Sequence, residues 1–264
     1  MKLSISHETH YIYEAPVRSS TQYLRLTPRD SVRQRVIEWR VEAPAKPVQT
    51  QDGYGNVLHV LTLDKPVTEI RIRAIGVVET VPALDDSADP VPLSPLVFLR
   101  NTDLTRPDAA LSQLAEGFRR RAGTLSGLRE LAAAILRQMP FKPGDTNVSS
   151  SAAEAFTTGS GVCQDHAHVF IACCRALGIP ARYVSGYVYS PGNADSHIAS
   201  HAWAEAWVVD RWRSFDIANK CPAGESHVKL AIGADYNDAS PIRGTRFGGG
   251  VETMTTAAYV ASNQ

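Results

Sequence analysis

The feature that most constrains this fold is a change in hydrophobic spacing along the chain. Through the first 81 residues, apolar side chains recur at every second position, as in half-buried β-strands. From residue 108 onward they recur at helical spacing before further strands follow. Residues 82–107, which lie between these regions, are rich in proline. The sequence therefore predicts an α+β protein: an antiparallel β-sandwich-like domain over 1–81, a linker over 82–107, and helices packed on an antiparallel sheet over 108–264.

The same spacing predicts the individual elements. In the first domain we expect strands over 3–13, 20–26, 36–41 and 70–81, and a hairpin in which 50–51 and 57–63 flank the turn sequence DGYGN. In the second domain we expect helices over 108–121, 127–139, 151–157 and 163–177, then strands over 181–189, 202–209, 211–215 and 251–260. The tail 245–264 is a candidate to pack back on the β domain.

Charge and hydropathy argue against nucleic acids and membranes as binding partners. Lys+Arg and Asp+Glu both number 27, so no basic excess points to nucleic acid. No apolar run reaches the roughly 20 residues that span a bilayer, and the first residues lack the apolar core of a signal peptide. We therefore expect a cytoplasmic protein without a membrane partner. The sequence gives no indication of its oligomeric state.

One cysteine stands where a chemical role is most plausible. The chain has four cysteines, at positions 163, 173, 174 and 221, and we expect all of them to be reduced. Cys163 follows the small residues of Gly159-Ser160-Gly161 and opens a predicted helix. The first amides of a helix lack internal partners and carry the positive end of its dipole, so they favour a thiolate. Cys163 is therefore the candidate nucleophile.

A thiolate nucleophile needs a base and a group that orients the base. His201 lies at the start of a predicted strand, and the short turn 209–211 leads into its antiparallel neighbour. That neighbour ends at Asp216, which the hairpin returns to the vicinity of His201. A carboxylate there would fix the imidazole tautomer and stabilise its charged form. The expected catalytic set is therefore Cys163, His201 and Asp216.

These segments resemble those of bacterial transglutaminase-like proteins. The strings that carry the resemblance are GVCQDHAHVFIACCRALGIPARYVSGY, SHAWAEAWV and SFDIAN, with HETHYIYEAPV, DGYGN and HVKLAIGADYNDASPIRG elsewhere. The resemblance implies a papain-like catalytic core over 108–264 behind an N-terminal β domain. It also implies that Cys163 is the nucleophile, His201 the base and Asp216 the orienting acid. The family usually carries Pro-Thr-Asn after the aspartate, and here Ile217-Ala218-Asn219 replaces it.

The chemistry that follows is acyl transfer through a thioester. The substrate would be a peptide or protein with a peptide, isopeptide or glutamine carboxamide carbonyl, and the acceptor water or an amine. We favour hydrolysis by a protease or amidase, because water is always present. The backbone amide of Cys163 would hold the oxyanion. This chemistry requires no cofactor and no metal.

Alternative roles are open to several of these residues. The chain could be a non-catalytic binding or scaffold protein on the same fold, or Cys163 could be a redox sensor. A redox sensor needs a nearby resolving cysteine, and Cys173 would lie about 15 Å along the helix. His166 and His168 are disfavoured as metal ligands with Cys163, because positions two apart on a helix face different ways. We expect Asp165 to act as a first-turn acid and Trp203, Trp207 and Trp212 to cover the back of the site.

Overall fold

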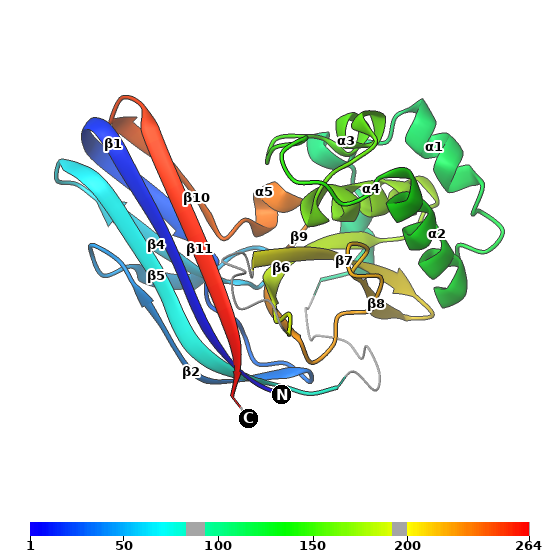
Figure 1. The fold of residues 1–264 in the computed structure, drawn as a ribbon, viewed down its shortest axis with the longest axis horizontal. Helices are drawn as coiled ribbons and strands as arrows, with labels where there is room; N and C mark the ends of the chain where they lie inside the picture. The colour runs from blue at the N-terminus through cyan, green and yellow to red at the C-terminus, as the bar shows by residue number, and fades with distance from the viewer. Residues whose placement is uncertain (83–92, 192–199, 264) are drawn as a thin grey trace.

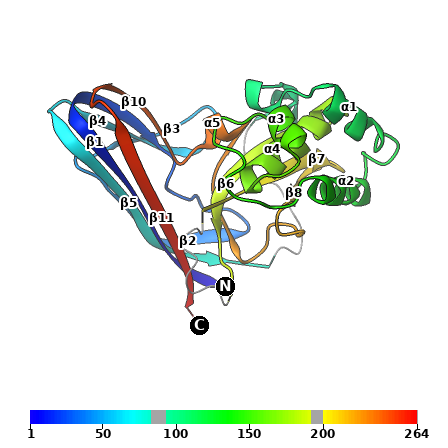
Figure 2. The same ribbon diagram turned by 45° about the horizontal axis from the view of Figure 1, so that its top comes forward.

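The computed structural model describes residues 1–82, 93–191 and 200–263, which form two β-sheets with helices beside one of them (Figure 1). A seven-stranded sheet lies on one side of the molecule, and a four-stranded sheet with its helices lies on the other. Figure 2 shows the same separation from a second direction. The predicted α+β class is confirmed. Within the described residues, no helix is long and apolar enough to cross a membrane.

The long strand β1 (Lys2–Leu24) organises the larger sheet. Its first half pairs with β5 (Val67–Thr80) and β11 (Glu252–Asn263), and its second half pairs with β4 (Val57–Leu63) and β10 (Ile242–Gly248). The strand β2 (Gln34–Glu42) pairs with β5, and the strand β3 (Val48–Gln51) pairs with β4. One hydrogen-bonded sheet therefore holds all these strands, in place of the two facing sheets of the expected sandwich-like domain. The reason is that the strands predicted over 3–13 and 20–26 are one continuous strand, which pairs with neighbours along its whole length.

Strands from both ends of the chain meet in this sheet. Lys2–Tyr13 of β1 is antiparallel to the last strand, β11, along its whole length. The tail thus packs on the N-terminal strands, whereas the domain boundaries at 81 and 108 stay a prediction. The strand predicted over 251–260 is present as β11, but β10 was not predicted, because 242–250 combines exposed polar residues with glycines and lacks an alternating apolar pattern.

The second sheet has the order β8-β7-β6-β9 and is antiparallel throughout. Its strands are β6 (Ala181–Val188), β7 (Ser200–Val208), β8 (Arg211–Phe215) and β9 (His227–Gly233). The helices are α1 (Ala109–Glu116), α2 (Leu125–Gln138), α3 (Ala152–Thr158), α4 (Cys163–Ala176) and α5 (Tyr236–Ala239). The helix α4 packs against β6 and β7, and α1, α2 and α3 surround α4. All the helices predicted by spacing are present, although α1 ends at Glu116 and not at residue 121.

The described part of the predicted linker is anchored in the core. It forms two short 3-10 turns, η1 (Pro95–Leu99) and η2 (Asp103–Thr105), in which Phe98 and Thr105 are fully buried. The buried Arg175 of α4 donates to the Phe98 carbonyl at 2.9 Å and to the Thr105 hydroxyl at 2.5 Å. Composition predicts only a linker here, because prolines and acidic residues outnumber the few apolar residues that anchor it. Residues 83–92 lie outside the described part.

Two side-chain amides fasten the larger sheet to the edge of β9. Gln34 donates to the Lys229 carbonyl and accepts from the Lys229 amide, both at 2.8 Å. Asn56, from the DGYGN turn, does the same with Ile232 at 2.8 and 2.9 Å. The amides thus take the place of a neighbouring strand along β9. Because backbone groups at a buried edge must be paired, this contact fixes the two sheets relative to each other.

We expect Asn56→Ala to lower the free energy of unfolding by about 2–4 kcal/mol, because it leaves the Ile232 N–H and C=O without partners in a buried setting. Urea unfolding followed by circular dichroism measures the loss. Gln51→Ala, an exposed change at the other end of the same turn, is the control and should cost less than about 0.5 kcal/mol. Equal losses in the two variants would contradict the assigned contact.

Candidate active site

Cys163 is the first residue of α4, as predicted. The helix start is held by Asp165, whose buried carboxylate accepts from the Val162 amide at 2.8 Å and from the Thr146 hydroxyl at 2.6 Å. A side chain at Gly161 would meet the Asp165 carboxylate at 2.7 Å, so glycine is required there. Asp165 therefore has the first-turn role expected of it, and it fixes the backbone that presents the thiol.

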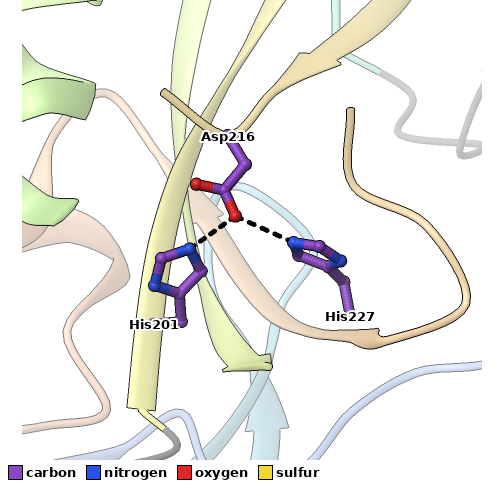
Figure 3. A group of neighbouring side chains, drawn as sticks. All are labelled: His201, Asp216 and His227. Atoms are coloured by element: carbon purple, nitrogen blue, oxygen red, sulfur yellow. Dashed lines mark hydrogen bonds and ion pairs between the residues drawn. The ribbon is translucent and has the colours of Figure 1, made fainter. Parts of the chain in front are cut away.

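The structure brings His201 and Asp216 together. His201 Nε2 donates to Asp216 Oδ2 at 2.7 Å, as Figure 3 shows. His201 also interacts with the thiol of Cys163. Because Nε2 is bonded to Asp216, Nδ1 is the ring nitrogen left for this contact. Burial disfavours the imidazolium, but the bonds to Asp216 and Cys163 outweigh it and raise the pKa of His201 to about 10. The ring is therefore a cation at neutral pH in this arrangement.

Two further residues donate hydrogen bonds to the Asp216 carboxylate. The Asn219 side-chain amide donates to Oδ2 at 2.7 Å, and the Asn219 backbone amide donates to Oδ1 at 3.1 Å. His227 Nε2 lies 2.9 Å from Oδ2 on the side away from His201 (Figure 3). Burial favours the neutral acid, yet the hydrogen bonds from His201, His227 and Asn219 hold the pKa of Asp216 well below its usual value. The replacement of Pro-Thr by Ile217-Ala218 thus leaves the asparagine in contact with the aspartate.

His227 is the site residue that sequence reasoning missed. Its Nδ1 accepts a hydrogen bond from the Gly224 amide at 3.1 Å, so the proton is on Nε2 and points at Asp216. His227 opens β9, a strand with little alternation because it is buried on both faces. In the sequence, His227 is only a histidine at the start of an apolar run. Such a pattern does not indicate which residue the histidine contacts.

His201, Asp216 and His227 are also the residue types that bind zinc. One donor atom from each lies within 4.8 Å of the others. The distances of 2.7 and 2.9 Å are those of N–H···O hydrogen bonds. A metal at this carboxylate would displace the His227 proton that the Gly224 contact places on Nε2. The geometry therefore favours a hydrogen-bonded network.

The other histidines of α4 have structural contacts. His166 is bonded through Nε2 to the Met139 carbonyl at 2.7 Å, and His168 Nε2 accepts from the Tyr236 amide at 3.1 Å. Burial lowers the pKa of His168 to about 3, so it stays neutral. Cys173 and Cys174 are buried in the core.

The back of the site is aromatic, and the loop that follows β8 is bonded back to Asp216. Trp203 and Trp212 are buried in one cluster with Phe98, and Trp207 is partly buried beside them. Cys221 exchanges two backbone hydrogen bonds with Asp216, at 2.8 and 3.2 Å. Cys221 therefore helps to hold the backbone that carries the carboxylate.

Cys163 and His201 open into a cleft of about 250 Å³ between the two sheets. The catalytic side of the cleft includes Tyr183, Ser185 and Gly186 of β6. The opposite wall comes from the larger sheet and consists of His7, Thr9 and Tyr11 of β1, Ile242 of β10, and Met254 and Thr256 of β11. The N-terminal and C-terminal strands therefore face the candidate nucleophile directly.

His7 joins this wall to the catalytic sheet. Its Nδ1 is bonded to the Tyr187 hydroxyl at 2.8 Å, and its Nε2 contacts the Thr256 hydroxyl at 3.1 Å. Burial lowers the pKa of His7 to about 4, so the ring is neutral at physiological pH. His7 thus both links the two sheets and lines the cleft.

A cysteine at a helix start, with a histidine–aspartate pair on an adjoining antiparallel sheet, defines a class of papain-like α+β proteins. Residues 112–217 match the transglutaminase-like superfamily, and residues 3–79 match the bacterial transglutaminase-like N-terminal region. The chain belongs to the bacterial transglutaminase-like family.

Relatives extend the similarity over nearly the whole chain. An uncharacterized protein of Mycobacterium leprae is 32% identical over 279 residues, which cover 98% of each chain. An uncharacterized protein of Mycobacterium tuberculosis is 32% identical over 269 residues, covering 91% of this chain and 86% of its own. The crystal structure of a proposed cysteine protease from Cytophaga hutchinsonii has a TM-score of 0.78 at 23% identity, covering 100% of this chain and 91% of that one. The last similarity shows a shared fold.

We expect His227→Leu to lower the free energy of unfolding by about 1–3 kcal/mol, because the buried Asp216 carboxylate loses a donor. His227→Gln should recover part of the loss, since its amide nitrogen can reach the same oxygen. Guanidinium unfolding of the three proteins gives the comparison. Identical losses for leucine and glutamine would show that the bond from His227 to Asp216 contributes nothing to stability.

Proposed function

We propose that this protein is a cysteine-dependent acyl-transfer enzyme that hydrolyses a peptide, isopeptide or glutamine carboxamide bond. The observation that carries the proposal is the combination of Cys163 at the start of α4 with a His201 that is bonded to Asp216 at 2.7 Å. A scaffold protein has no need for a buried carboxylate aimed at a histidine beside a thiol. The assigned roles are nucleophile for Cys163, acid and base for His201, and orienting acid for Asp216.

The electrostatics support a thiolate–imidazolium pair. The pKa of His201 is raised to about 10, against the effect of burial, by Asp216 and by Cys163 itself. A cation beside a thiol and the positive end of α4 both favour the thiolate. The reactive form would therefore exist before substrate arrives, and the imidazolium would already hold the proton that the leaving amine needs.

The proposed cycle has two halves. The Cys163 thiolate attacks the carbonyl carbon, the carbonyl electrons move to oxygen, and the Cys163 backbone N–H, free at the helix start, donates to that oxyanion. The C–N bond then breaks, and His201 protonates the departing amine. In the second half, neutral His201 takes a proton from water, the hydroxide attacks the thioester carbonyl, and the C–S bond breaks. The products are a carboxylic acid, which loses its proton to solvent and leaves as the carboxylate, and the regenerated thiolate–imidazolium pair.

His227 and Asn219 would act through Asp216. Both donate to the carboxylate from sides that His201 does not occupy. Held this way, Asp216 has little freedom to turn away as His201 gains and loses its proton. His227 is thus proposed as a positioning residue.

The cleft lining supports an uncharged, extended substrate segment. Tyr11, Tyr183, Tyr236 and Met254 provide apolar surface around Cys163, and Thr9 and Thr256 provide hydroxyls. A glutamine side chain or an apolar peptide segment fits such a lining, which would contact it from both sheets. Water is always available as acceptor, so hydrolysis is favoured, and transfer to an amine is the competing outcome.

Mass-resolved alkylation by iodoacetamide across pH tests the nucleophile. Cys163 should react fastest near neutral pH, and His201→Ala should slow it on the order of 10-fold or more, because the thiolate loses its cation. Cys221→Ser is the matched control and should leave the rate unchanged. Four equally slow thiols would favour the scaffold role instead.

Glutamine-containing peptides, incubated with and without a primary amine, separate the two reactions by product mass. We expect a carboxylate product in both samples and no product with Cys163→Ser. An amide product that dominates whenever the amine is present would replace hydrolysis by transamidation.

The rate should fall on the alkaline side as pH rises through about 10, because His201 loses its proton there. Asp216→Asn removes the carboxylate that raises this pKa, so the alkaline limb should move to lower pH, and turnover should drop on the order of 100-fold. A pH profile of kcat/KM for both proteins measures the shift. An alkaline limb that stays in place would remove Asp216 as the partner of His201.

A further inference from the structure

A second and larger cavity lies behind Asp216, apart from the cleft. It measures about 410 Å³ and is bounded by α2, the end of β8 and the loop 216–222. Figure 1 shows α2 beside β8 at the edge of the four-stranded sheet. Among the described residues, none that lines the cleft also lines this cavity. The proposed reaction has no use for it, although its volume is that of a small-molecule site.

The floor of this cavity is apolar. From α2 it takes Ala132, Ala133 and Leu136, which share one helix face, and from the opposite side it takes Phe215, Ile217 and Pro222. These side chains offer a hydrophobic slot between a helix and a loop, and an apolar occupant would remove that surface from water.

The rim of the cavity is cationic. Arg129 and Arg137 of α2 and Lys220 of the loop all line it. In the part of the chain that the structure describes, none of the three has an ion pair or a hydrogen bond with another side chain. The acid that lines the cavity, Asp216, is already bonded to His201, His227 and Asn219. Three like charges around one opening repel one another, and an anion would relieve that repulsion.

We propose that this cavity binds a small amphipathic carboxylate, with its apolar body between Leu136 and Phe215 and its carboxylate at Arg129, Arg137 and Lys220. Arginine suits this ligand because its guanidinium donates two parallel hydrogen bonds to a carboxylate. The occupant would lie against the segment in which Cys221 and Asp216 exchange backbone hydrogen bonds. The site is therefore built into the support of the proposed active site, but it does not depend on the proposed reaction.

Three naphthalene probes that differ in charge test the proposal on the full chain. The naphthalene carboxylate should bind at least about tenfold tighter than the neutral naphthalene alcohol or the cationic naphthylmethylamine. Isothermal titration calorimetry measures the three affinities. Equal affinity for the three probes would overturn the proposal, because the rim would then contribute nothing.

Variants of the lining residues test whether the carboxylate binds in this cavity. Arg129→Gln with Arg137→Gln should weaken carboxylate binding by about tenfold or more. Arg120→Gln removes an exposed arginine outside the cavity and should change nothing. Ala132→Trp should abolish binding by filling the slot while the three cations remain, with circular dichroism confirming the fold. Unchanged binding in either the double variant or Ala132→Trp would overturn the assignment.

Alkylation of the two partly exposed thiols shows in which of the two cavities the ligand binds. Cys221 lines this cavity, and Cys163 lines the cleft. At alkaline pH, the bound carboxylate should slow alkylation of Cys221 and leave the rate at Cys163 unchanged. Protection of Cys163 alone would place the ligand in the cleft and refute the second site, whether or not the enzyme is active.

Discussion

The rest of this structure depends on the contact between the larger sheet and the edge of β9. Gln34 and Asn56 are side chains of the larger sheet, yet they bond the backbone of Lys229 and Ile232 as a neighbouring strand would. An open strand edge is a site for unwanted pairing, and here two amides close it. They also set the register between the sheets, because sliding by one residue would present each amide with the wrong backbone groups. The cleft between the sheets keeps its width for the same reason.

The same strand connects that contact to the candidate chemistry. His227 opens β9, its Nδ1 is fixed by the Gly224 amide, and its Nε2 donates to Asp216. Asp216 in turn accepts from His201, which faces Cys163. A buried carboxylate with this many donors stays ionised and has one favoured orientation. The position of the larger sheet is thus transmitted through β9 to the orientation of the proposed base by bonds of fixed geometry.

The features that could be predicted from the sequence are those that depend on residues close together in the chain. Helix α4 with Cys163 at its start, and the hairpin that returns Asp216 to His201, depend on neighbours within a few residues and were predictable from spacing. His227 reaches Asp216 across a loop, and β9 is buried on both faces, so neither leaves an alternating pattern. The strand β1 was divided in two because Pro16 interrupts its pattern, although the sheet accommodates that residue at a shift in register. The cleft wall could not be predicted, because it pairs residues from opposite ends of the chain.

The segment beyond residue 217 joins the two halves of the structure. The matched family regions end at 79 and 217, and β9, β10 and β11 follow the second of them. This segment supplies the edge held by Gln34 and Asn56, the histidine behind Asp216, and the strand that pairs with β1 across the cleft. Bond cleavage in the proposed cycle needs the carbonyl held close to the sulfur in a fixed direction. Because β1 and β11 line that cleft, the larger sheet would help to set the geometry of the proposed reaction.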